Sequence, residues 1–125
     1  MQKIFVFGNE DVELDSLPLK LLPELRQQFP EIEFVIKDPN EEIDFPEEVI
    51  ILDTTVGISE VAIFDDLKKF AAVPRVSMHD FDALTNLRYL QKLGKIKTVK
   101  IIAVPNKKAT LSDLVSSVAV AISTI

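Results

Sequence analysis

Two carboxylates and one imidazole stand at positions where an α/β chain gathers its reactive groups. Asp15 ends an acidic loop that follows a glycine-asparagine turn, Asp53 directly follows the apolar run 49–52, and His79 is the only histidine. Mixed oxygen and nitrogen ligands suit a borderline divalent ion such as zinc or nickel. Because a fourth ligand is missing, the pattern predicts an open metal site rather than a closed structural one.

Each of these side chains also has a purely structural explanation. Asp15 precedes a predicted helix, where an acidic residue caps free N–H groups and complements the helix dipole, an effect of about 0.3–1 kcal/mol. Asp53 can close its strand with an Asx turn, and a lone histidine such as His79 before a helix is more often a surface or capping residue. Only their joint placement beyond strand ends, where open α/β sheets bind ligands, favours a site.

Other kinds of chemistry are excluded by what the sequence lacks. It has no cysteine, which removes disulfides, thiolate metal sites and a cysteine nucleophile. It has no Gly-x-Ser-x-Gly elbow, Gly-x-x-x-x-Gly-Lys loop or His-Glu-x-x-His helix, and its 3 glycines give little support for a nucleotide-phosphate cradle. With 20 acidic against 14 basic residues, a net charge of −6, nucleic acid is not an expected partner.

The elements that must position these residues alternate between strands and helices. Apolar runs predict strands at 4–7, 32–36, 49–52, 73–78 and 99–104, and a strand or edge hairpin at 58–64; apolar spacings of three and four predict helices at 17–29, 80–93 and 111–125. Ser16 is the expected N-cap of the first helix, and Pro23 predicts a kink or a break in it. Gly94 should end the second helix, and Thr110 or Ser112 should begin the last.

This alternation predicts a three-layer αβα sandwich around a mostly parallel or mixed sheet of about five strands. At 125 residues the chain fits a single domain, residues 1–125. No apolar run reaches the roughly 18 residues of a membrane helix, and the N-terminus lacks the pattern of a signal peptide. We therefore expect a cytoplasmic monomer with no membrane contact.

The motifs follow one another in a characteristic order. They are a strand into Gly8-Asn9, an acidic loop to Asp15, a strand ending at Asp53, Ser77-x-His79 before a Leu-rich helix, a strand at 99–105 and a closing helix from Leu111-Ser112. This order, over nearly the whole chain, resembles that of the hydrogenase maturation endopeptidases. Each motif is short, so the specificity of the resemblance comes from the combined order and spacing.

The resemblance implies a peptidase function and a metal site. The family removes a C-terminal peptide from the large-subunit precursor of nickel-iron hydrogenase after nickel has entered that precursor. An acidic residue after the Gly-Asn turn, an Asp at the end of a central strand and a His before a helix form the family's metal site. The matching residues here are Asp15, Asp53 and His79.

The resemblance also implies the binding partners. The partner is the hydrogenase large-subunit precursor, with Gly8, Asn9 and Asp38 as substrate-binding residues. The metal is the nickel of that precursor, or another divalent metal such as zinc, and no organic cofactor is expected.

The sequence departs from the family pattern in two places. Leu14 replaces one member of the usual acidic pair, and Lys37-Asp38-Pro39-Asn40 replaces an Asp-Gly-Gly-Thr type loop. These departures keep a second hypothesis open, a non-proteolytic relative that acts as a metal-sensing or precursor-binding chaperone. A third is an unrelated α/β binding domain in which the three residues serve as caps and turns.

Overall fold

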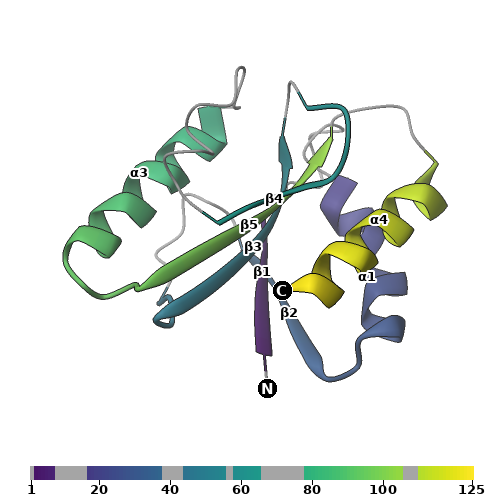
Figure 1. Ribbon diagram of the computed structural model, residues 1–125, viewed down its shortest axis with the longest axis horizontal. Coiled ribbons are helices and arrows are strands. Elements are labelled where there is room, and N and C mark those ends of the chain that lie inside the picture. The colour runs from purple at the N-terminus through teal and green to yellow at the C-terminus, as the bar shows by residue number, and fades with distance from the viewer. Residues whose placement is uncertain (1, 8–16, 38–43, 56–57, 66–77, 106–109) are drawn as a thin grey trace.

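The computed structural model describes residues 2–7, 17–37, 44–55, 58–65, 78–105 and 110–125, and for residues 78–84 it describes the backbone alone. These residues form a sheet of five strands between two helical layers (Figure 1). The strands are β1 Gln2–Phe7, β2 Ile32–Lys37, β3 Glu48–Thr55, β4 Ala62–Phe64 and β5 Thr98–Pro105, and the helices are α1 Leu17–Gln28, α3 Met78–Lys92 and α4 Leu111–Thr124. The predicted three-layer arrangement is confirmed.

The strands lie in the order β2-β1-β3-β5-β4. β1, β2, β3 and β5 are parallel, and the edge strand β4 runs antiparallel to β5. β2 lies on one side of β1 and β3 on the other, so the direction in which the chain crosses the sheet reverses between β1 and β3. Ligands of open α/β sheets bind beyond the carboxyl ends of the strands at such a reversal.

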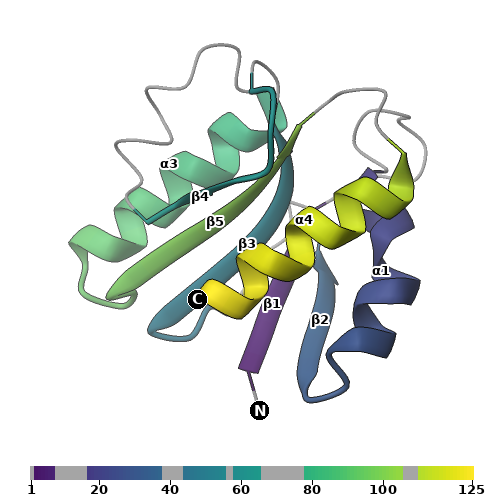
Figure 2. The ribbon, with the colours of Figure 1, turned by 45° about the vertical axis from the view of Figure 1, so that its right-hand side comes forward.

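The two faces of the sheet bury separate apolar clusters. Figure 2 shows α1 and α4 over one face and α3 over the other. Side chains alternate between the faces along each strand. In β3, Ile50 and Leu52 pack into the cluster under α1 and α4, whereas Val49 and Ile51 pack into the cluster under α3.

α1 is continuous from Leu17 to Gln28 although it contains Pro23. The predicted break is therefore wrong. An internal proline costs about 3 kcal/mol, but burial of a leucine side chain contributes roughly 1.5–3 kcal/mol. Leu21, Leu22 and Leu25 are all almost fully buried, and together they offset the proline, which lies on the exposed side. Ser16, the expected N-cap, lies outside the described residues.

The ends of the other two helices follow local rules. Gly94 has a φ of +76° and its N–H donates to the Gln91 carbonyl at 3.1 Å, which confirms it as the stop after α3. Thr110 caps α4, because its Oγ1 accepts a hydrogen bond from the Asp113 N–H at 3.2 Å. Met78 belongs to α3, so the predicted strand does not reach it, and residues 73–77 lie outside the described part. None of the described helices is long and apolar enough to cross a membrane.

Candidate functional site

β3 changes from apolar to polar at Asp53 while remaining buried. Asp53, Thr54 and Thr55 are 9%, 4% and 0% exposed. The strand was expected to end at Asp53, but β3 continues through Thr55, which pairs with Pro105 of β5. That expectation was wrong because the ladder with β5 is formed by backbone groups, which do not depend on the polarity of the side chains.

The Asp53 carboxylate is held inside the strand and does not close a turn. Its Oδ1 accepts a hydrogen bond from the Thr54 N–H at 2.8 Å, and both residues are paired in the ladder with β5. Burial of an ionised carboxylate is costly unless hydrogen bonds, an opposite charge or a metal ion compensate it. A role in ligand binding would account for a buried carboxylate at this position, whereas an Asx turn would not.

The position of Asp53 in the strand fixes the face to which it points. It follows Val49 and Ile51 at intervals of two, and both pack under α3, so the carboxylate lies on the α3 face of the sheet. Its ladder partner Ala103 belongs to the same cluster.

The backbone of His79 lies toward the same face and edge. α3 begins at Met78 and leads to the start of β5, so its first turn lies near the carboxyl ends of the strands, as Figure 1 shows. His79 is in that first turn. The element order thus places the His79 backbone and Asp53 toward the same end and face of the sheet, while the His79 side chain is outside the described atoms.

The structure does not show where the other predicted site residues lie. Asp15, Gly8, Asn9 and Asp38 lie outside the described residues. Among the side chains that the structure describes, no group of three or more potential metal ligands comes together. Because Asp53 is the only one of the three proposed ligands with a described side chain, the metal site stays a prediction.

Sequence reasoning missed the two threonines after Asp53. The Oγ1 atoms of Thr54 and Thr55 are buried and have no hydrogen-bond partner among the residues that the structure describes. By alternation, Thr55 faces the α3 side with Asp53, whereas Thr54 faces the α1 and α4 side. The signal was available in principle, because two β-branched residues after an apolar run favour continuation of the strand.

Comparison with known proteins places the fold. No protein-family model matches the chain, and no curated protein sequence does. The hydrogenase maturating endopeptidase HybD from E. coli superposes with a TM-score of 0.69 at 15% identity, over 99% of this chain and 93% of that one. An endopeptidase from Escherichia coli gives 0.65 at 15% identity, with the same coverage of 99% and 93%.

A hydrogenase 3 maturation protease gives a TM-score of 0.62 at 18% identity, over 94% of this chain and 86% of that chain. The similarity to these solved structures extends over nearly the full length of each chain, and it includes the sheet that carries Asp53. At these identities it establishes the architecture and leaves the site chemistry to be argued from the residues. This chain has the fold of the hydrogenase maturation endopeptidases.

Proposed function

We propose that this protein is a peptidase that removes the C-terminal peptide of a hydrogenase large-subunit precursor and reads the nickel in that precursor through Asp15, Asp53 and His79. The observation that carries the proposal is the buried Asp53 carboxylate beside the chain reversal of the sheet, on the face where α3 begins. The fold shared with two hydrogenase maturation proteases supports the same assignment.

The chemistry of these residues suits a metal carried by the substrate. Carboxylate oxygen and imidazole nitrogen are ligands that nickel accepts. Asp53 is shielded from water, so a divalent cation brought by the precursor would interact with its carboxylate strongly. Three protein ligands leave coordination positions for groups of the precursor, so the protein would bind loaded precursor more tightly than empty precursor. Zinc is the alternative metal.

The mass of the precursor tests this function directly. Purified protein is incubated with nickel-loaded and with nickel-free large-subunit precursor, and each mixture is followed by mass spectrometry. We expect loss of the C-terminal peptide from the loaded form alone. Binding of the loaded form with no change of mass would instead assign the protein as a non-proteolytic, metal-sensing chaperone.

Substitutions test the ligand assignment separately. Asp53→Asn and His79→Ala should abolish calorimetric binding of nickel or zinc and the difference between loaded and empty precursor. Glu24→Gln, an exposed carboxylate on α1, is the matched control and should bind as the wild type does. Undiminished metal binding in both site variants would refute the assignment.

The substrate contacts form a further part of the proposal. Gly8, Asn9 and Asp38 would bind the peptide around the scissile bond. Asp38→Ala should then raise the KM for the loaded precursor while leaving calorimetric metal binding intact. An unchanged KM would remove Asp38 from the substrate site.

A further inference from the structure

A groove of about 640 Å³ lies between the edge strand β4 and the helix α4. We call it the edge groove; its walls include Glu60, Ile63, Asp113, Leu114 and Val120. We propose that the edge groove binds an extended, positively charged segment of the precursor. This proposal rests on the proposed function and adds a second contact with the same substrate, on the opposite face of the sheet from Asp53.

The groove exists because the helical layer stops short of the sheet edge. Ile63 of β4 pairs with Ile102 of β5, and paired residues point to the same face. Ile102 is fully buried on the α1 and α4 face, yet Ile63 is 39% exposed. Figure 2 shows α4 over the middle of the sheet with β4 beyond it.

Two large apolar side chains face this uncovered channel. Val120 of α4 is 64% exposed and lines the groove together with Ile63. Full burial of such a side chain contributes roughly 1.5–3 kcal/mol. An occupant with aliphatic side chains would therefore gain binding energy from both walls.

The edge strand determines the conformation of the occupant. Within the described part of the chain, β4 is the last strand of the sheet order, with β5 on its inner side. The outer edge of such a strand offers backbone hydrogen-bonding groups to an extended peptide, while pockets beside it receive alternate side chains. A segment in strand conformation fits the groove better than a helix, which cannot use the backbone edge.

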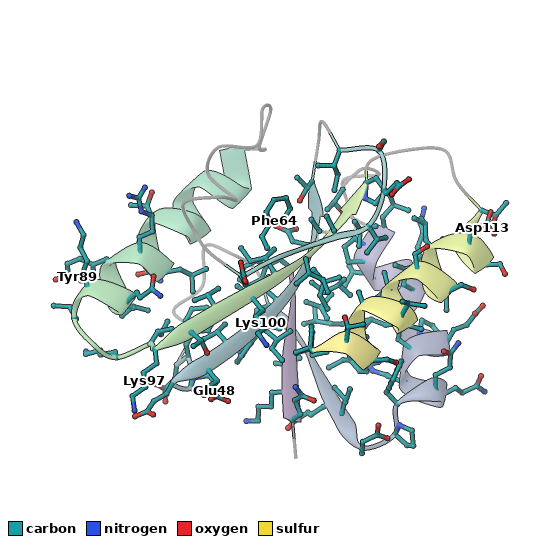
Figure 3. The ribbon with its side chains drawn as sticks, in the orientation of Figure 1. Glu48, Phe64, Tyr89, Lys97, Lys100 and Asp113 are labelled. Atoms are coloured by element: carbon teal, nitrogen blue, oxygen red, sulfur yellow. The ribbon has the colours of Figure 1, made fainter. Side chains whose placement is uncertain are left out.

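The charge of the groove determines the chemistry of the occupant. Glu60 and Asp113 are exposed and acidic, and no lysine, arginine or histidine is among the described residues that line the groove. Figure 3 shows Asp113 at the first turn of α4. A lysine or arginine of the bound segment would be attracted to this end of the groove.

The acidic end also lies toward the candidate site. Pro105 lines the groove and is the ladder partner of Thr55, two residues beyond Asp53. A segment held along α4 would thus emerge at the carboxyl edge of the sheet, where the nickel-bearing part of the precursor is proposed to bind. The groove and the site would then engage two parts of one substrate.

The apolar wall is tested by Val120→Arg, which introduces bulk and a positive charge into the groove. We expect its affinity for the loaded precursor to fall about tenfold, with a higher KM and an unchanged kcat. Tyr89→Arg on α3 is the control, because Tyr89 is 61% exposed and lies outside the groove (Figure 3). Circular dichroism verifies that both variants are folded.

The acidic end is tested by Glu60→Lys against Glu24→Lys on α1. The first variant should bind the precursor more weakly at low salt, with a difference that shrinks as ionic strength rises, while the second should match the wild type.

If the wild type cleaves the precursor and both Val120→Arg and Glu60→Lys bind it as the wild type does, the groove proposal is overturned and the proposed function is not. A wild type that neither binds nor cleaves any precursor would overturn the proposed function as well. A sedimenting dimer that Val120→Arg disrupts would assign the groove to a second copy and overturn the proposal.

Discussion

Apart from the exposed Glu48, the two halves of β3 are equally buried but differ in chemistry. Val49 to Leu52 are 1–8% exposed and fill the two apolar clusters, while Asp53 to Thr55 are 0–9% exposed and polar. Both halves lie in one ladder with β5. Burial in the first half stabilises the fold, whereas the second half buries two hydroxyls that have no partner among the described residues, and such burial opposes stability. Such a local loss of stability is what functional sites often show.

The largest effect is expected from Leu52→Ala in the apolar half. Leu52 is 1% exposed in the cluster under α1 and α4, so truncation should lower the free energy of unfolding by about 2–5 kcal/mol. Urea denaturation measures this, with Ile36→Ala as a control on a side chain that is 48% exposed. If Leu52→Ala lowered the free energy of unfolding less than Ile36→Ala does, the assignment of Leu52 to the core would be contradicted.

Substitutions of the threonines in the polar half of β3 should raise the free energy of unfolding. Thr54→Val keeps the shape of the side chain and removes a buried hydroxyl that has no partner in the described part of the chain, so the free energy of unfolding should rise by about 1 kcal/mol. Thr55→Val should stabilise similarly, but it should also alter precursor cleavage because Thr55 faces the Asp53 side. If both substitutions lowered the free energy of unfolding, the two hydroxyls would have to form hydrogen bonds. The two halves of β3 would then not differ in their effect on stability.

Asp53→Asn should separate stability from function. The amide oxygen can still accept the Thr54 N–H, so the free energy of unfolding should change by less than about 1 kcal/mol. Discrimination between nickel-loaded and empty precursor should nevertheless be lost, because the charged ligand is gone. If Asp53→Asn lowered the free energy of unfolding as much as Leu52→Ala does, the role of Asp53 would be chiefly structural.

The smallest effect is expected at the amino end of β3. Lys97 Nζ lies 3.3 Å from Glu47 Oε2, and both side chains are about two thirds exposed, at 69% and 66%. Figure 3 shows Lys97 beside Glu48 at this edge. Because exposed ion pairs contribute about 0.2–1 kcal/mol, Lys97→Ala should lower the melting temperature only slightly and less at high salt. A large loss would show that this end of the strand depends on charge.

The candidate site was only partly predictable for a physical reason. Asp53 could be singled out because a charge after an apolar run is visible in the sequence. Its burial and the face to which it points could not, since both depend on β5, which joins β3 from a distant part of the chain. The unpartnered hydroxyls of Thr54 and Thr55 were invisible for the same reason.

Local chemistry by itself determined where most elements lie. The apolar periods gave the alternation of strands and helices, Gly94 ended α3 and Thr110 capped α4, because these rules act within a few neighbouring residues. Only the tertiary structure decided that α1 continues past Pro23, that β3 runs on through Asp53 to Thr55, and that a groove is left beside β4. Those outcomes depend on packing and backbone pairing between segments far apart in the chain, which no local pattern contains.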